Sequence, residues 1–183
     1  IFAHPSSHVD ALVVAALRGA FEYQGQKCSA ASRLYVPRSL WPAFRDRYVA
    51  EVDQIQMGPP TDFTNFFSAV IDRGAYDTIR GYIETAKADP NVEVLTGGSC
   101  DDSVGYYIEP TTLVTKNPSS ITMCEEIFGP VLTIYVYEDE DLEATLKLCN
   151  ETSPYALTGA VFGQDRYAIA HMTDVLRDAA GNF

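Results

Sequence analysis

The chain has 183 residues, of which 46% are hydrophobic and 21% charged, and a formal net charge of −12 at pH 7. This length and composition are typical of one globular domain with a sizeable core. The excess of acidic residues disfavours nucleic acid and anionic membranes as partners, because phosphate contacts require clustered Lys and Arg. No apolar run approaches the roughly 20 residues of a membrane span, and we find no signal-peptide pattern.

Expected strands and helices alternate along the chain. Runs rich in apolar and β-branched residues predict strands at 1–4, 33–36, 92–96, 106–114, 131–137 and 157–162. Apolar residues at helical spacing predict helices with stripes at 9–21, 41–55, 75–86, 142–149 and 168–179. We expect Ser7, Ser39, Asp72 and Asp165 to begin or cap four of these helices. This order predicts an α/β fold with a largely parallel sheet flanked by helices.

Two of these elements carry more specific expectations. The helix that ends at Phe21 has apolar residues on both faces, so we expect it to be buried nearly all round. The segment 157–162 is almost continuously apolar, which favours a strand covered on both sides.

A cysteine stands in the loop between the first helix and the next strand. Residues 21–30, FEYQGQKCSA, end the helix, break it at Gly25 and place Cys28 just before the strand at 33–36. A loop between rigid elements suits a nucleophile, and the thiolate is a cysteine's attacking form. Lys27 gives weak support as a neighbouring cation, since adjacent side chains in an extended segment point apart. From the residues alone, a small packed cysteine is the commoner role.

A second motif, EEIFGPV, follows at 125–131. Read alone, its paired glutamates fit a solvated turn, and Gly129 and Pro130 would shape the chain before the next strand.

Taken together, the two motifs resemble the active-site segments of the aldehyde dehydrogenase superfamily, in the same order and at a similar separation. Further segments match the family, and the finer match is to its branch that acts on glutamate semialdehyde, the open form of Δ1-pyrroline-5-carboxylate. The matching segments are GQKCSA at 25–30, EEIFGPV at 125–131, YIEPT at 107–111, YALTGAVF at 155–162, and for the branch FEY at 21–23, Ser29 and CDDSVGY at 100–106.

This resemblance implies a role for four residues. Cys28 is the expected nucleophile, forming a thiohemiacetal and then a thioester with the aldehyde. Glu126 is expected to bind the ribose next to the nicotinamide of NAD, and Phe128 to pack near the nicotinamide ring. Ser29 is expected to help hold the carboxylate of the substrate. The expected reaction is the NAD-dependent oxidation of L-glutamate semialdehyde to L-glutamate, as in proline catabolism.

The resemblance also implies what lies outside the chain. We expect residues 1–183 to be the catalytic domain, because they contain neither a Gly-rich dinucleotide fingerprint nor the Glu-Leu-Gly-Gly-type motif that carries the family's general base. The expected partners are an aldehyde, the rest of the same polypeptide and further copies of the full-length enzyme. The expected location is the mitochondrial matrix in a eukaryote and otherwise the cytoplasm.

Other functions stay open on the residues alone. One alternative is an aldehyde dehydrogenase that acts on another aldehyde. A second is a cysteine hydrolase or acyl-transferase that uses Cys28, and a third is a non-catalytic α/β module. A hydrolase would need a histidine near Cys28, and no motif places His4, His8 or His171 there. The four cysteines show no C-x-x-C spacing, so we expect reduced thiols and no metal site.

Overall fold

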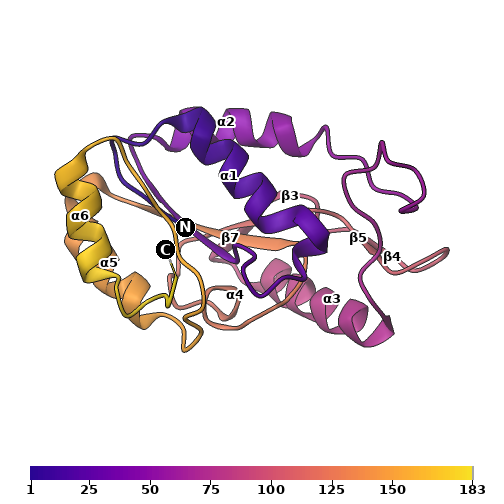
Figure 1. Ribbon diagram of the computed structural model, residues 1–183. Coiled ribbons are helices and arrows are strands. Elements are labelled where there is room, and N and C mark those ends of the chain that lie inside the picture. Colours follow the sequence, from indigo (N-terminus) through magenta and orange to yellow (C-terminus); the bar gives the residue numbers. More distant parts are fainter. Residues whose placement is uncertain (183) are drawn as a thin grey trace.

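The computed structural model describes residues 1–182 and shows an α/β fold, as the sequence predicts. A six-stranded sheet has the order β3-β6-β7-β2-β1-β8, and a separate pair is formed by β4 and β5. All neighbouring strands of the main sheet run parallel except β3, which is antiparallel to β6. Helices lie on both sides of the sheet and at its β8 end (Figure 1).

The element bounds follow the alternation expected from the sequence. The strands are β1 (Phe2–Ala3), β2 (Arg33–Pro37), β3 (Val92–Thr96), β4 (Cys100–Asp101), β5 (Tyr107–Ile108), β6 (Thr111–Thr115), β7 (Val131–Tyr137) and β8 (Val161–Phe162). The helices are α1 (Val9–Phe21), α2 (Trp41–Val52), α3 (Arg73–Ala88), α4 (Ile121–Cys124), α5 (Leu142–Glu151) and α6 (Arg166–Val175), with 3₁₀ turns η1 (Glu22–Gly25) and η2 (Asp139–Asp141).

The central strands are buried on both faces, which fixes their register. Successive side chains of a strand point to opposite faces. Leu34 and Val36 of β2 accordingly pack under α1 and α2, whereas Tyr35 packs with the residues of α5 and α6. In β7, Leu132 and Ile134 join the first group and Tyr137 joins the second, so both strands contribute to both cores. A slip of one residue would exchange these faces.

Two of the four predicted helix caps are present and two are not. Asp72 accepts from Ala75 N at the start of α3, and Asp165 accepts from Tyr167 N and Ala168 N at the start of α6, as predicted. The predictions for Ser7 and Ser39 are wrong. Ser7 Oγ instead donates to the carbonyls of His4 and Phe162, and α2 begins after Leu40 without a side-chain cap.

Three further expectations need correction. The outer face of α1 is open, with Val14 56% exposed, so the helix is not buried all round. The predicted strand at 106–114 is broken between β5 and β6 at Glu109 and Pro110, because proline has no N–H to donate to a ladder. At 157–162 only Val161–Phe162 form a strand, and Leu157 is 58% exposed. The β4–β5 pair and α4 were not predicted.

The two motif loops meet through their backbones. Gly25 has φ +65°, and a Cβ at this position would lie 2.2 Å from the carbonyl oxygen of Gly129. Only glycine combines this left-handed conformation with so close an approach. The loop after α1 and the loop before β7 are therefore held together at the carboxyl end of α1.

Replacing Gly25 should separate these loops. We expect Gly25→Ala to lower the free energy of unfolding by about 1–3 kcal/mol. The new methyl group would overlap backbone atoms, which cannot move aside by a change of rotamer as a side chain can. Gly81→Ala is the matched control, since a Cβ at this position on α3 would meet nothing within 4 Å. The control should raise stability by about 0.5–1 kcal/mol. Chemical denaturation measures both, and equal stability of Gly25→Ala and the unmodified chain would contradict the contact.

Candidate active site

The cysteine loop is anchored at both ends and exposed in the middle. Phe21, at the end of α1, is fully buried, and Ala31 N donates to Gly19 O at 2.8 Å where the loop returns to the helix. Between these anchors, Ala30 N donates to Lys27 O at 3.0 Å and closes a turn with Cys28 at its corner. The Cys28 side chain is exposed. The fold thus presents this thiol to the outside on a short, braced turn.

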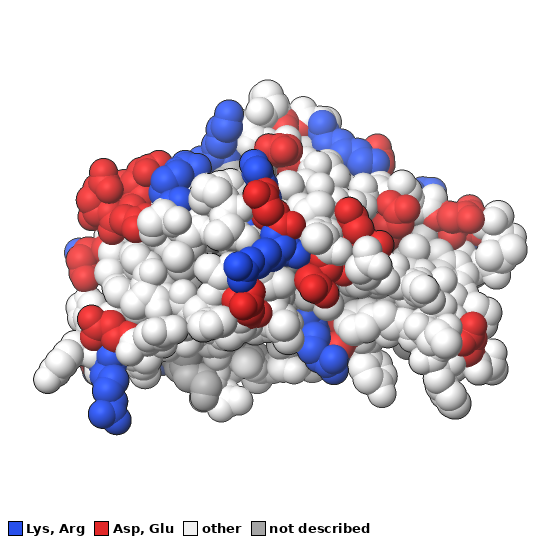
Figure 2. Space-filling model, turned by 90° about the horizontal axis from the view of Figure 1, so that it is seen from above, with Lys and Arg blue, Asp and Glu red and all other residues white. Residues whose placement is uncertain are grey.

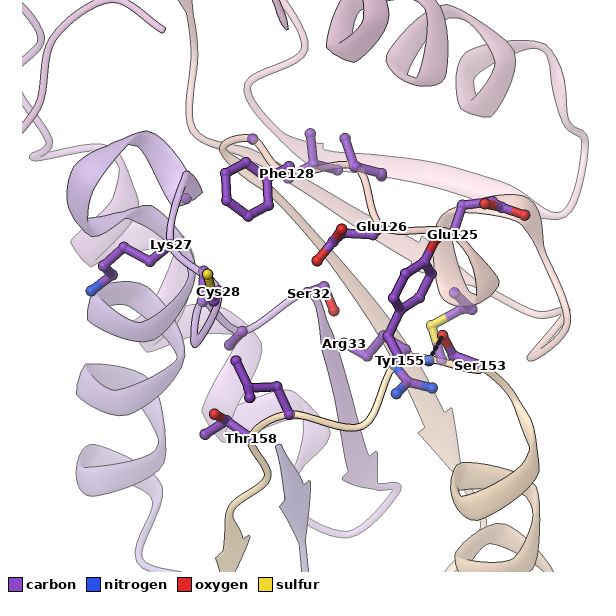
Figure 3. Close-up of a pocket in the computed structure, with 18 of the residues that line it drawn as sticks. Lys27, Cys28, Ser32, Arg33, Glu125, Glu126, Phe128, Ser153, Tyr155 and Thr158 are labelled. Carbon is purple, nitrogen blue, oxygen red and sulfur yellow. Dashed lines mark hydrogen bonds between the residues drawn. The ribbon is translucent and has the colours of Figure 1, made fainter. Parts of the chain in front are cut away.

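The charge of Lys27 is directed to another residue. Lys27 Nζ lies 3.2 Å from Glu22 Oε2, and Arg18 pairs with the same carboxylate. The hydrogen bond from Lys27 is the main cause that lowers the pKa of Glu22 below its usual range. Figure 3 shows the Lys27 side chain extending away from Cys28. Lys27 therefore supports the base of the loop.

The second motif forms the facing wall. It follows α4 directly and leads into β7, and its Ile127 is buried against the α3 core. Phe128 has φ 56°, an unusual conformation for a residue with a side chain, and the residue is 40% exposed. In Figure 3, Phe128 and Glu126 are directed toward Cys28, whereas Glu125 points away from it.

A third wall comes from residues 153–158, which the sequence did not indicate as part of the site. Ser153 Oγ donates to Cys124 O at 2.9 Å and accepts from Tyr155 N at 3.3 Å, which ties this segment to α4. Tyr155 and Leu157 both line the cleft and are about half exposed. The prediction of a covered strand at 157–162 hid Leu157. The signal that could have found both residues is Ser153-Pro154, a turn-forming pair beside exposed apolar residues.

These walls enclose a cleft of about 180 Å³. It brings together Cys28, Glu126 and Phe128, three of the four residues singled out in the sequence. Ser29, the fourth, is exposed on the same turn but does not line the cleft. Arg33 also lines the cleft and was not predicted from the sequence. Its Nη1 atom is buried and has no hydrogen-bond partner among residues 1–182.

The contents of the cleft limit the chemistry. The described residues contain no group of three or more His, Cys, Asp or Glu side chains that could hold a metal ion. His4 hydrogen-bonds Ser6 and His171 hydrogen-bonds Glu143, and no histidine lines the cleft in the described part of the chain. A cysteine hydrolase of the Cys–His type therefore has no base next to Cys28 within residues 1–182.

The four thiols differ in environment. All are free, as expected from the sequence. Burial raises the pKa of Cys149 and also that of Cys100. Both thiols consequently carry less thiolate at neutral pH than an ordinary cysteine. Cys28 is the exposed member of the set.

Residues 1–182 match the profile of the aldehyde dehydrogenase family. Similar proteins include the mitochondrial Delta-1-pyrroline-5-carboxylate dehydrogenase of Dictyostelium discoideum, 57% identical over 100% of this chain, and that of Bos taurus, 53% identical over 100%. The chain spans 33% and 32% of the length of these two relatives.

A solved structure is similar over the same range. The Delta-pyrroline-5-carboxylate dehydrogenase from Mycobacterium tuberculosis, bound with NAD, superposes with a TM-score of 0.93 at 43% identity. The match covers 100% of this chain and 33% of that one. The sequence match, the parallel sheet and the paired motif loops thus agree, and the chain belongs to the aldehyde dehydrogenase family.

Proposed function

We propose that this chain is the nucleophile-bearing part of an NAD-dependent dehydrogenase that oxidises L-glutamate semialdehyde, the open form of Δ1-pyrroline-5-carboxylate, to L-glutamate. The observation that carries the proposal is the cleft, where the exposed thiol of Cys28 faces Glu126 and Phe128. These two residues belong to a segment about a hundred residues further along the chain. The names of the similar proteins support the choice of substrate.

Cys28 is the proposed nucleophile. Its Sγ attacks the aldehyde carbon, a C–S bond forms, and the carbonyl electron pair moves to oxygen as a thiohemiacetal. The backbone N–H of Cys28 makes no hydrogen bond to another residue among the 182 described, so it is available to donate to this oxygen. A preorganised donor at a developing oxyanion is worth about 2.7–4 kcal/mol in other enzymes.

The cleft fits one end of a nicotinamide dinucleotide. Glu126 provides carboxylate acceptors for a ribose diol, and the exposed ring of Phe128 provides an apolar face for a nicotinamide. The chemistry that a bound nicotinamide supplies is a hydride acceptor for the thiohemiacetal carbon, whose oxidation leaves a thioester. The volume of 180 Å³ is below the roughly 300–1,000 Å³ of ligand sites, so the rest of the dinucleotide requires surfaces beyond this cleft.

Ser29 is the proposed contact for the substrate carboxylate. Its hydroxyl is exposed beside Cys28 but outside the cleft, so an aldehyde held by Ser29 would reach the thiol without occupying the cofactor end. A hydrogen bond to a charged group contributes about 1.5–3 kcal/mol.

Hydrolysis of the thioester completes the reaction. Water adds to the acyl carbon, the C–S bond breaks, and glutamate leaves as the Cys28 thiol is restored. We assign the base for this water to the part of the full-length protein that lies beyond the chain, together with the dinucleotide domain. Residues 1–183 are accordingly proposed to be the catalytic domain, which works only when joined to those parts.

Two further proposals concern the partners and the location of the full-length protein. The full-length protein is proposed to assemble with copies of itself and, in a eukaryote, to reside in the mitochondrial matrix; the names of similar eukaryotic proteins include the word mitochondrial. Nucleic acid is disfavoured by the net charge of −12. On the face seen in Figure 2, blue and red side chains are interspersed. Among the basic residues, Arg47 pairs with Asp10 and Arg18 pairs with Glu22.

The nucleophile assignment predicts an order of thiol reactivity. Cys28 should react fastest with iodoacetamide at neutral pH in the full-length protein, and Cys149 slowly, because burial raises the pKa of its thiol. Peptide mass mapping over time gives the four rates. Equal labelling of Cys28, Cys100 and Cys149 in the folded protein would contradict the assignment.

The cofactor assignment predicts a slower hydride step. Glu126→Gln and Phe128→Ala should each reduce single-turnover NADH formation about tenfold or more in the full-length protein, because they misplace the acceptor relative to the thiohemiacetal. Glu125→Gln is the matched control, since this neighbouring carboxylate points away from Cys28. Wild-type NAD affinity together with a wild-type hydride step in both variants would refute the cofactor role.

The domain assignment predicts that the 183 residues alone are folded but inactive. Circular dichroism should show helix and sheet, since three buried clusters close the core. No NADH should appear with glutamate semialdehyde and NAD, because the base and most of the dinucleotide site lie elsewhere. Sustained turnover by this chain would place both within residues 1–183.

A further inference from the structure

Two glutamines on either side of Gly25 bind the same neighbouring segment. Gln26 Oε1 accepts from the backbone N–H of Ile71 at 3.0 Å. The Gln24 amide, oriented so that both its oxygen and its nitrogen find partners, accepts from Ser68 N at 2.7 Å and donates to Tyr23 O at 2.9 Å. We call these two contacts, from Gln24 and Gln26 to residues 68–71, the glutamine clamp.

The segment that receives the clamp is itself fixed. Val70 is 3% exposed, and its N–H donates to Tyr106 O at 2.9 Å. The next residue after the segment, Asp72, caps α3 by accepting from Ala75 N at 2.8 Å. The glutamines thus hold the cysteine loop to the start of a helix rather than to a free loop.

The same helix supports the opposite wall of the cleft. Gly129 lies against Ile79 of α3 so closely that a Cβ there would be 2.5 Å from Ile79 Cδ1. Ile127 packs in the same buried cluster as Ile79 and Val70. Residues 68–79 are therefore a common support for the loop of Cys28 and the loop of Phe128.

The backbone beside the clamp is one that needs support. Tyr23 and Gln24 have φ 54° and 58°, a left-handed conformation that residues other than glycine rarely adopt. Such strain persists where surrounding contacts enforce it. Tyr23 is 75% exposed and packs little, so this stretch is held by the side-chain hydrogen bonds of Gln24 and Gln26 together with the contact of Gly25 with Gly129.

We propose that Gln24 and Gln26 are positioning residues that set the distance and direction of Cys28 relative to Glu126 and Phe128. They act through the clamp on residues 68–71 and touch neither substrate nor cofactor. This inference rests on the proposed function of Cys28 as the nucleophile. Reacting groups in enzymes need near-attack geometry, and a displacement of about 1 Å can cost roughly 100-fold in rate.

The test uses three variants of the full-length protein. Gln26→Ala removes the acceptor, Gln26→Glu keeps an acceptor oxygen of the same reach, and Gln54→Ala changes an exposed glutamine just after α2. We expect Gln26→Ala to lower kcat about tenfold or more with nearly unchanged KM for NAD, whereas Gln26→Glu and Gln54→Ala stay within about threefold of wild type. Gln24→Ala should behave like Gln26→Ala.

A second measurement does not depend on activity. Amide hydrogen exchange followed by mass spectrometry should show faster exchange at 22–31 and 68–72 in Gln26→Ala, with no change over the β2–β7 core. Faster exchange throughout would indicate general destabilisation and overturn the proposal, as would wild-type kcat in Gln26→Ala or equal losses in its Ala and Glu variants. A wild-type protein without aldehyde oxidation would overturn the proposed function, and local exchange would then decide whether the clamp exists.

Discussion

The close backbone contact between Gly25 and Gly129 is the constraint on which the site depends. It joins two loops that are a hundred residues apart in the chain, and neither glycine has room for a side chain. One loop follows α1 and carries Cys28; the other precedes β7 and carries Glu126 and Phe128. Because β2 and β7 pair residue by residue in parallel, the loops that precede both strands lie at the same edge of the sheet. The sheet brings the motifs near each other, and the glycine contact holds the two loops together.

Packing explains why this edge is rigid. β2 and β7 are buried on both faces, so their loops rest on strands that cannot shift register without exposing the cores of Leu34 and Tyr35. Exposed apolar groups then collect above this rigid base, at Phe128, Tyr155 and Leu157. Exposed apolar groups that gather in one place indicate a surface that is covered in function. The proposed account assigns them to the cofactor and to the remainder of the polypeptide.

Most helices and strands could be predicted from the sequence because apolar spacing and capping residues, which are local features, determine them. Asp72 and Asp165 cap their helices because their carboxylates accept from first-turn N–H groups that have no partner within the helix. The prediction that Ser7 caps a helix was wrong because its hydroxyl hydrogen-bonds two carbonyl oxygens instead. One of them belongs to Phe162, 155 residues away. The prediction of a covered strand from Leu157 was wrong because an apolar run has the same sequence pattern in a covered strand and in the wall of a cleft.

The site was predictable only in part, and for a different reason. Cys28, Glu126 and Phe128 were found through resemblance, and no spacing rule would have joined them. Arg33, Tyr155 and Gln26 come to the site through contacts that only the folded chain creates. The histidine-dependent alternative is weakened by geometry as well, since His4 and His171 hydrogen-bond elsewhere.

The central claim is that Cys28 carries the acyl group during turnover. The direct measurement is rapid acid quenching of the full-length protein with glutamate semialdehyde and NAD, followed by peptide mass spectrometry. The account predicts a glutamyl thioester on the peptide that contains Cys28, which appears with the first turnover and disappears as glutamate is released. NADH formation without any adduct on Cys28, or with the adduct on another cysteine, would contradict it.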